Sequence, residues 1–472
     1  MKTIETRVAI VGGGTAGMNA FREARKLTDR VLLIENHHFG TTCVREGCMP
    51  SKLLIAAAHA RGDALRADPF GVRLDRSSVK VDGPAVMSRV QKERDRFLGF
   101  VMSDVEGFPA ENKLLGKAEF VSANELVVDG ETKVKFESAV IATGSVPFLP
   151  PKSGLEGLGD RLLTNENVFD LPDVPRSVAV WGAGVIGMEL AGAFANLGAR
   201  VTVSDMTDSI CAISDPDIAQ DAREIFSRRL DLRLKTKATA KLGGDGVILS
   251  FEGPDGKKSE ETYEYLLVAT GRRPNFQGLG LGKLDGLKLD GRGVPVSGRF
   301  DMATSLPNIF IAGDASNQSP LLHEASDQGK IAGKNAALFP KAPEKGLRRS
   351  HIGVVFSDPQ IMSAGEKRID LERRVRSFDD EIAVGRVSFS NQGRSRVMLV
   401  NEGSLSVYAD KKTGRFLGAE MIGPAAEHIA HLLAWAHQME MTAPQMLEMP
   451  FYHPVIEEGV RTALRDAAAK LA

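Results

Sequence analysis

The sequence contains few cysteines and no excess of charge of either sign. Only three cysteines occur among 472 residues, which excludes a disulfide-stabilised secreted scaffold and fits a protein of a reducing compartment. The formal net charge of −1 gives no overall field that would attract nucleic acid or an anionic membrane surface. We therefore expect neither nucleic acid nor a membrane among the partners.

Long apolar runs are absent as well. No uncharged stretch approaches the length of a membrane-spanning helix, and residues 1–7 lead into an apolar strand without the apolar core of a signal peptide. We expect a soluble, cytoplasmic protein. A chain of 472 residues has room for three or four domains of ordinary size.

Two of the three cysteines lie close together, in the segment Gly40-Thr-Thr-Cys43-Val-Arg-Glu-Gly-Cys48-Met-Pro-Ser-Lys52. With four residues between them, Cys43 and Cys48 can close a small disulfide ring if the backbone curls into a helical turn. Such a short ring removes little entropy from the unfolded chain, so it is more often redox-active than structural. The alternative is a pair of inert thiols, as we expect for Cys211, which has no obvious partner.

The first half of the chain contains a dinucleotide-binding pattern. An apolar strand at 7–11 runs into Gly12-Gly-Gly14-Thr-Ala-Gly17, a helix is predicted over 18–27, and a strand at 31–34 ends at Glu35. The glycines allow the backbone to approach a pyrophosphate at a helix N-terminus, and the acid accepts hydrogen bonds from a ribose. Strand, glycines, helix, strand and acid follow one another in the order that such a site requires.

The same pattern recurs in the second half. A strand at 177–181 precedes Gly182-Ala-Gly184-Val-Ile-Gly187, and Asp205 follows a strand at 201–203. The first glycine and the acid are 23 residues apart in both copies (35 − 12 and 205 − 182), which predicts two dinucleotide sites. Asp205 would repel a 2′-phosphate, and neither Met206 nor Thr207 after it is an arginine, so the sequence favours NAD over NADP.

Further strands complete the pattern. A β-meander predicted over 114–141 and a strand at 266–268 each lead into Ala-Thr-Gly, and a strand at 309–311 is followed by Gly313-Asp314, which suits a cofactor polyol. From residue 351 onward alternating strands and a helix over 425–439 predict a separate α+β domain. The strands expected there span 385–390, 396–400 and 405–409.

Taken together, these motifs resemble the FAD-dependent pyridine nucleotide–disulfide oxidoreductases, the family of dihydrolipoamide dehydrogenase and glutathione reductase. The likeness covers essentially the whole chain and includes the C-terminal His453-Pro454-Val-Ile-Glu-Glu458. The resemblance implies an α/β fold of two Rossmann-like domains that bind FAD and NAD, followed by an α+β dimerisation domain. The domains implied are residues 1–150 (FAD), 151–276 (NAD), 277–348 (a central domain that completes the FAD site) and 349–472 (dimerisation).

The resemblance also implies roles for individual residues. Cys48 would be the charge-transfer thiolate next to the flavin, and Cys43 the interchange thiol that attacks the substrate. His453 would carry the proton of that thiol, with Glu458 holding the imidazole in the productive tautomer. The family forms a homodimer in which this histidine enters the active site of the partner subunit, and the His453–Pro454 bond is expected to be cis.

The residues expected at the cofactors lie in the glycine motifs, in the Ala-Thr-Gly strands and in the segments that follow them. For the flavin they are Gly12, Gly14, Gly17, Glu35, Gly40, Thr42, Lys52, Ala118, Thr143, Gly144, Asp314 and Leu322, and Lys52 and Glu189 would form an ion pair beside it. For NAD they are Gly182, Gly184, Gly187, Asp205, Ala238 and Gly271. No metal is expected, because the spacing of His428, His431 and His437 on one predicted helix does not bring all three together.

The cysteine segment departs from the commonest form in dihydrolipoamide dehydrogenases. Thr41 replaces a glycine, and Val44-Arg45-Glu46 stands where that form has Leu-Asn-Val. The two charges beside the disulfide could alter its redox potential or the entrance through which substrate reaches it. We expect NAD-linked oxidation of dihydrolipoamide, free or protein-bound, with reduction of another small disulfide or of a quinone as the alternative. A non-catalytic flavoprotein, a scaffold or a nicotinamide sensor, would need neither the cysteine pair nor His453.

Overall fold

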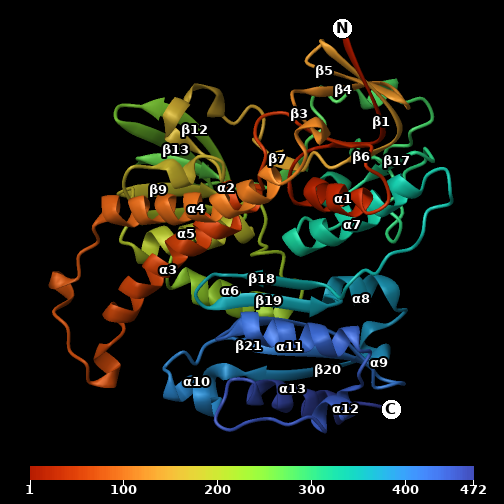
Figure 1. The fold of residues 1–472 in the computed structure, drawn as a ribbon. Helices are drawn as coiled ribbons and strands as arrows, with labels where there is room; N and C mark the ends of the chain where they lie inside the picture. The colour runs from red at the N-terminus through yellow and green to blue at the C-terminus, as the bar shows by residue number, and fades with distance from the viewer. The chain divides into compact units, whose positions relative to one another are not determined.

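The computed structural model describes all 472 residues, and the chain divides into two compact units. Unit 1 contains residues 1–50, 89–148 and 271–348, and unit 2 contains residues 51–88, 149–270 and 349–472 (Figure 1). Each unit is therefore assembled from three separate stretches of chain. The division into four domains at 150, 276 and 348 remains a prediction. No helix has both the length and the apolar composition that crossing a membrane requires.

Unit 1 is built on a seven-stranded sheet of order β3-β2-β1-β6-β5-β4, with β17 also paired to β6. Its strands are β1 (Lys2–Val11), β2 (Val31–Glu35), β3 (Lys113–Leu115), β4 (Ala118–Ser122), β5 (Glu125–Val128), β6 (Thr132–Ile141) and β17 (Ile309–Ile311). One edge of β6 pairs with β1; on its other edge, its first residues pair antiparallel with β5 and its last residues pair parallel with β17. The predicted meander is thus confirmed from Ala118 onward, whereas β3 pairs parallel with β2.

Two helices of unit 1 approach each other closely. Helices α1 (Thr15–Arg25), α2 (Thr42–Glu46) and α7 (Leu322–Leu338) belong wholly to unit 1, whereas α3 (Cys48–Leu65) and α4 (Gly83–Glu106) each contain residues of both units. Helices α1 and α7 lie side by side (Figure 1). In α7, Gly329 and Gly333 face Ala16 and Ala20 of α1, and a Cβ at either glycine would lie 2.2 Å from a backbone oxygen of α1. Only glycine permits the two backbones to pack at this distance.

Unit 2 repeats the topology of the first glycine motif in a five-stranded parallel sheet of order β11-β10-β9-β15-β8. Its strands are β8 (Leu162–Leu163), β9 (Ser177–Trp181), β10 (Arg200–Ser204), β11 (Asp231–Arg233) and β15 (Tyr265–Val268), and helix α5 (Val185–Asn196) follows the glycines. In both sheets the strand before the glycines lies between the strand that ends in the acid and the strand that leads into Ala-Thr-Gly. The repeat in the sequence is therefore a repeat of topology.

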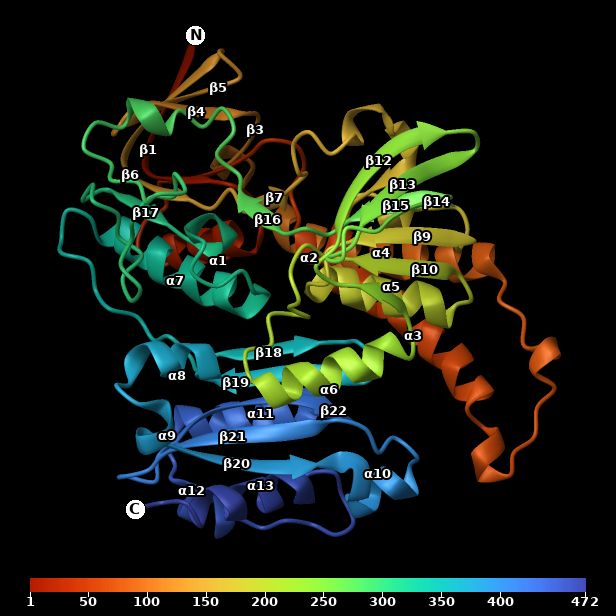
Figure 2. The same cartoon turned by 180° about the vertical axis from the view of Figure 1, so that it is seen from behind.

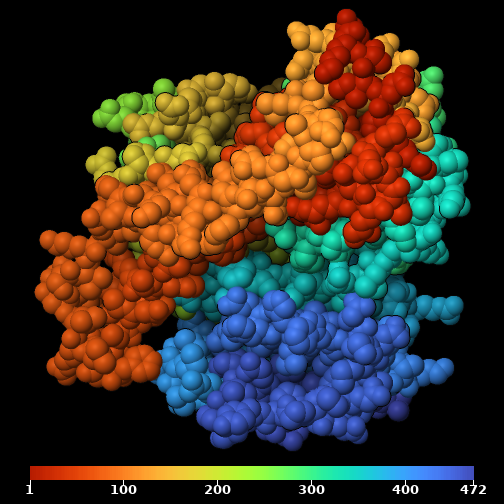
Figure 3. All heavy atoms as spheres, in the orientation of Figure 1, coloured from red at the N-terminus to blue at the C-terminus, as the bar shows by residue number.

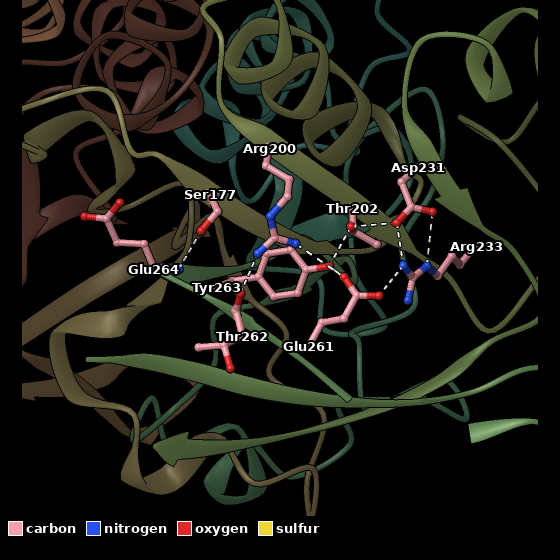
Figure 4. A network of polar contacts seen from close by, with 9 residues as sticks. All are labelled: Ser177, Arg200, Thr202, Asp231, Arg233, Glu261, Thr262, Tyr263 and Glu264. Carbon is pink, nitrogen blue, oxygen red and sulfur yellow. Dashed lines mark hydrogen bonds and ion pairs between the residues drawn. The ribbon is translucent and has the colours of Figure 1, made fainter. Parts of the chain in front are cut away.

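A three-stranded antiparallel sheet is attached to this parallel sheet by a network of polar contacts (Figure 4). Its strands are β12 (Lys237–Gly243), β13 (Gly246–Glu252) and β14 (Lys258–Tyr263). The Tyr263 hydroxyl lies 2.6 Å from Thr202 Oγ1 and 2.8 Å from Glu261 Oε2. Burial raises the pKa of Tyr263, so the phenol remains a neutral donor between the two sheets.

Residues 349–472 form an antiparallel sheet of order β18-β19-β22-β21-β20 with helices on both faces (Figure 2). The elements are β18 (Ile352–Val355), β19 (Gln360–Gly365), β20 (Ile382–Ser388), β21 (Ser404–Asp410), β22 (Phe416–Gly423), α11 (Ala426–Gln438) and α13 (Glu458–Ala468). Helix α6 (Pro216–Ser227), from an earlier part of unit 2, also packs on this sheet. Leu405 and Val407 of β21 point into the core shared with α11 and α13. Tyr408 points to the opposite face, where its hydroxyl lies 3.0 Å from Oδ2 of Asp215, the N-cap of α6. The α+β architecture is as predicted.

The predicted strand at 396–400 is wrong. Helix α10 (Gly393–Val397) ends there, and the next three residues, Met398 to Val400, are exposed, with φ of Leu399 at +53°. The apolar run has the composition of a strand, but its first two residues form the last turn of α10, and β20 and β21 pair directly with each other. The segment between α3 and α4, residues 66–82, is likewise exposed almost throughout (Figure 3).

Candidate active site

The first glycine motif forms the turn between β1 and α1. A Cβ at Gly12, where φ is +111°, would lie 2.2 Å from the Ala142 oxygen, and a Cβ at Gly17 would lie 1.8 Å from the Gly12 oxygen. At Gly14, the N-cap of α1, no atom lies within 4 Å of the Cβ position. The turn is therefore closed by two glycines and open at the third, where a pyrophosphate can approach the helix N-terminus.

Three other polar groups of unit 1 suit a dinucleotide that carries a flavin. Glu35 Oε2 accepts a hydrogen bond from Gly13 N at 2.6 Å, so the acid lies against the glycine turn. Thr143 Oγ1 and His323 Nε2 are buried without a hydrogen-bond partner in the protein. Because an unpaired buried polar atom is costly, both atoms fit a site that is completed by a polar ligand. These residues therefore fit FAD.

His323 lies in the segment that the resemblance places at the flavin, and the sequence favoured packing over proton transfer for it. A contact between its ring and a polar ligand was not predicted. The unpartnered Nε2 is the signal, and it depends on burial. Asp314, by contrast, lies as expected directly after β17, and its Oδ2 accepts a hydrogen bond from Ser145 Oγ at 2.7 Å.

The second glycine motif has the same geometry as the first. A Cβ added at Gly182 would lie 2.3 Å from the Ala269 backbone oxygen, and a Cβ added at Gly187 would lie 2.0 Å from the Gly182 backbone oxygen. At Gly184 no atom lies within 4 Å of the Cβ position. Asp205 Oδ2 accepts a hydrogen bond from Ala183 N at 2.8 Å, as Glu35 does from Gly13. The two turns can thus hold two dinucleotides in the same manner.

The remaining cofactor residues are distributed over turns and strand ends. Gly40, Gly144 and Gly271 have φ values of +118°, +68° and +119°. Ala118 begins β4, Ala238 lies on β12, Thr42 begins α2, and Leu322 begins α7. Their contacts with a cofactor remain predictions.

The cysteine segment curls into two helical pieces, as a small ring requires. Cys43 lies in α2 and is half-buried, whereas Cys48 is exposed and begins α3. The Thr41 side chain caps α2 by accepting a hydrogen bond from Val44 N at 3.3 Å. The first residue of an 18-residue helix is a favourable place for a thiolate, because the helix N-terminus carries partial positive charge.

Arg45, between the two cysteines, is directed toward the loop before them. Its Nη2 donates to the Phe39 oxygen at 2.8 Å, and its Nε is buried without a partner. A Cβ at Gly40 would lie 3.1 Å from Arg45 Nε and 3.3 Å from Leu98 Cδ1. Arg45 therefore stabilises the loop that leads into the cysteine segment.

Lys52 and Glu189 form the predicted ion pair, with Nζ 2.7 Å from Oε2. Glu189 is 5% exposed, and its second oxygen accepts a hydrogen bond from Phe356 N at 2.8 Å. The Lys52 ammonium also lies 4.6 Å from the centre of the Phe356 ring. A buried carboxylate is tolerated only with such partners, and here both oxygens have one. The position of the pair beside a flavin remains a prediction.

His453 and Glu458 are in contact. His453 Nδ1 lies 3.0 Å from Glu458 Oε2, and the imidazole is 80% exposed. The hydrogen bond with His453 lowers the pKa of Glu458, so the carboxylate is ionised at neutral pH and accepts from Nδ1. This contact leaves Nε2 of the exposed ring for proton exchange. The His453–Pro454 bond is cis, as predicted.

Comparison with known proteins agrees with this geometry. Residues 6–329 match the pyridine nucleotide-disulphide oxidoreductase family, and residues 352–464 match the dimerisation domain of the same family. The chain belongs to this family. Its members depend on FAD and bind NAD(P), and the matching dimerisation domain indicates a homodimer.

Individual relatives are similar over nearly the whole chain. Dihydrolipoyl dehydrogenase of Bacillus subtilis is 31% identical to this chain over 467 residues, and the alignment covers 97% of each of the two chains. Dihydrolipoyl dehydrogenase of Geobacillus stearothermophilus is 31% identical over 464 residues, and the alignment covers 96% of this chain and 94% of the relative. The HOCl-induced flavoprotein disulfide reductase RclA from Escherichia coli superposes with a TM-score of 0.80 at 22% identity, over 97% and 99% of the two chains. LpdA from Mycobacterium tuberculosis superposes with a TM-score of 0.80 at 24% identity, over 98% and 99%. The two structures confirm the fold.

The three histidines of α11 contact different atoms. His428 Nε2 lies 3.8 Å from Glu427 Oε1, His431 Nδ1 lies 2.7 Å from the Glu427 oxygen, and His437 Nδ1 lies 2.7 Å from Ser350 Oγ. No group of three or more histidine, cysteine, aspartate and glutamate side chains is placed to hold a metal ion.

The reactivity of the three thiols should differ. Cys211 is 6% exposed, and burial, together with the charge of Glu189, raises the pKa of its thiol. We therefore expect a chromogenic disulfide reagent to titrate two thiols in the reduced, folded protein at pH 8, those of Cys43 and Cys48, and three after denaturation. Three fast-reacting thiols in the folded protein would contradict the buried position of Cys211.

Proposed function

We propose that this disulfide oxidoreductase oxidises dihydrolipoamide, free or protein-bound, to lipoamide with NAD⁺. The observation that carries the proposal is the exposed His453 imidazole held by Glu458, because proton transfer to and from a dithiol needs such a group and electron transfer alone does not. The relatives named dihydrolipoyl dehydrogenase, at about 31% identity, support the same substrate. The cysteine usage supports a cytoplasmic location.

The chemistry begins at the dithiol. Nε2 of His453, contributed by the partner subunit of the homodimer, accepts a proton from one substrate thiol, and the thiolate attacks Cys43 Sγ of the Cys43–Cys48 disulfide. A mixed disulfide forms and Cys48 leaves as a thiolate. The second substrate thiol then attacks the substrate sulfur of the mixed disulfide, Cys43 leaves and takes the first proton back from His453, and the imidazole accepts the proton of the second thiol. Lipoamide is released, and both cysteines are left reduced.

The protein holds the cofactors that remove these two electrons. FAD, when bound, would supply the redox group between the reduced cysteines and NAD⁺, and one dihydrolipoamide would then give one NADH and one proton. Gly12, Gly14, Glu35, Thr143 and Asp314 would hold FAD, and the second glycine turn with Asp205 would hold NAD⁺. The Lys52 ammonium, oriented by Glu189, would stabilise negative charge at the flavin.

The decisive experiment is reduction of NAD⁺ by dihydrolipoamide with the purified, FAD-loaded protein. We expect turnover that falls by at least about 10³-fold in Cys43→Ser, because the mixed disulfide then cannot form. Reduction of the flavin by NADH should persist in this variant, which shows that both cofactor sites are intact. Absence of turnover in the unchanged protein would contradict lipoamide as the substrate, and a series of other small disulfides and quinones would then be compared.

A further inference from the structure

Both carboxylate oxygens of Asp205, the acid of the second glycine motif, accept hydrogen bonds from the protein itself. Oδ2 accepts from Ala183 N at 2.8 Å, and Oδ1 accepts from Thr207 N at 2.7 Å and from Thr207 Oγ1 at 2.8 Å. Asp205 therefore defines where the ribose of the dinucleotide must lie, at the edge of the glycine turn and beside residues 206–208. A 2′-phosphate at this place would need a cation within reach.

Two cations at the end of β11 lie near this edge. Arg233 is beside Asp205, because its backbone oxygen accepts a hydrogen bond from Asp205 N at 3.1 Å. Its guanidinium, however, is held by Asp231 at 2.6 Å and Glu261 at 2.5 Å (Figure 4). It also lies 4.6 Å from the centre of the Phe251 ring. With two carboxylates and an aromatic ring around it, Arg233 is part of the contact between the sheets.

Lys235 is the second cation, and it is held much less firmly. Its backbone N donates to the Thr207 oxygen at 2.9 Å, so it lies directly beside the loop that follows Asp205. Its ammonium makes one ion pair, with Asp208 Oδ2 at 2.9 Å, and the two side chains are 59% and 58% exposed. Exposed pairs of this kind contribute little to stability, so a conformational role alone does not account for Asp208.

We propose that Asp208 is a second determinant of nicotinamide choice, which pairs with Lys235 and so withholds the cation best placed to bind a 2′-phosphate. Asp205 disfavours the phosphate directly, and Asp208 removes its counter-charge. The chain thus selects NAD with two carboxylates, although the lysine that NADP would need is present. This inference rests on the proposed use of NAD.

The test compares binding of NAD⁺ and NADP⁺ to the FAD-loaded protein by titration calorimetry, which needs no turnover. In Asp208→Asn we expect the ratio of the NADP⁺ to the NAD⁺ dissociation constant to fall roughly tenfold, as for one gained charge-assisted hydrogen bond. The gain should shrink as ionic strength rises, because the new contact is exposed to solvent. It should also disappear in Asp208→Asn combined with Lys235→Met.

A matched control exists in the same domain. Asp255 and Lys257, in the turn between β13 and β14, form an exposed pair of similar geometry at 2.7 Å. Asp255→Asn removes one acid from the same domain without touching the nucleotide edge, so the ratio should stay at the wild-type value. If the ratio falls by a similar factor in Asp255→Asn, the change in net charge alone explains the effect, and the proposal is overturned.

Two other results would also overturn it. If the ratio of the two dissociation constants is unchanged in Asp208→Asn, the Asp208–Lys235 pair only connects the loop after Asp205 to the end of β11. A gain that survives Lys235→Met would assign the phosphate to another cation, such as Arg223, which also acts on Asp208. Failure of the unchanged protein to bind NAD⁺ is a different outcome, since it contradicts the proposed function together with this inference.

Discussion

Replacement of His453 by glutamine should lower the turnover of dihydrolipoamide by about 10²- to 10⁴-fold, the usual contribution of a positioned general acid–base group. Glutamine is close in size but cannot accept and return a proton at neutral pH. Because NADH reaches the flavin without passing through the dithiol, flavin bleaching by NADH should keep the wild-type rate. Steady-state turnover and rapid-mixing reduction of the flavin, measured on the same preparation, separate the two steps.

The neighbouring carboxylates provide the control for this prediction. Glu458 accepts from His453 Nδ1, whereas Glu457 precedes it as the N-cap of α13. Glu458→Gln should lower turnover and shift the pH profile, because the amide cannot stabilise a charged imidazole, and Glu457→Gln should leave both unchanged. Equal effects of the two changes would contradict the assigned orientation of His453.

The pH dependence of the pair has a definite sign. The pKa of Glu458 in the folded protein is lowered by its hydrogen bond with His453. Its contribution to stability is therefore present above the ordinary glutamate pKa and is lost only as the pH falls through the lowered value. A titration near neutral pH in the activity profile must then belong to another group than Glu458.

Gly17→Ala and Gly14→Ala should fail in different ways. The added Cβ at Gly17 would lie 1.8 Å from the Gly12 oxygen, so the turn between β1 and α1 cannot keep its shape. We expect a loss of about 1–3 kcal/mol or more in the free energy of unfolding, with or without FAD. At Gly14, where no protein atom lies within 4 Å and φ is −79°, alanine should leave the folded protein intact.

The cost of Gly14→Ala should instead appear in FAD binding. A methyl group there enters the space through which the pyrophosphate reaches the backbone, so FAD affinity should fall by roughly tenfold or more. The melting temperature of the FAD-free protein and the dissociation constant of FAD distinguish the two effects. Gly184→Ala is the matched control, because Gly184 is equally open in the second turn. It should weaken NAD⁺ and spare FAD, and loss of FAD there would contradict the assignment of the two sites.

The local motifs were predictable because each consists of residues that lie close together in the sequence. A buried strand, three glycines and an acid in both halves indicated two dinucleotide sites. In the structure, Glu35 and Asp205 each accept a hydrogen bond from the glycine turn that precedes them. The helical curl of the cysteine segment and the contact between His453 and Glu458 likewise involve residues only five positions apart. Short spacing restricts the backbone to few conformations, so pattern and structure agree.

Contacts between residues far apart in the sequence were decided by the tertiary structure. Strand β17 completes the first sheet beside β6, and Gly329 and Gly333 meet α1, because the fold returns distant segments to the same sheet. The segment 396–400 has the composition of a strand, but it forms the end of α10 and the exposed residues after it. Three side-chain environments likewise depend on burial and on neighbours from other parts of the chain. They are the contact of Arg45 with the Phe39 oxygen, the unpartnered Nε2 of His323 and the ion pair of Asp208 with Lys235. A local sequence pattern describes the backbone of its own segment, whereas the surroundings of a side chain are set by how all the segments pack.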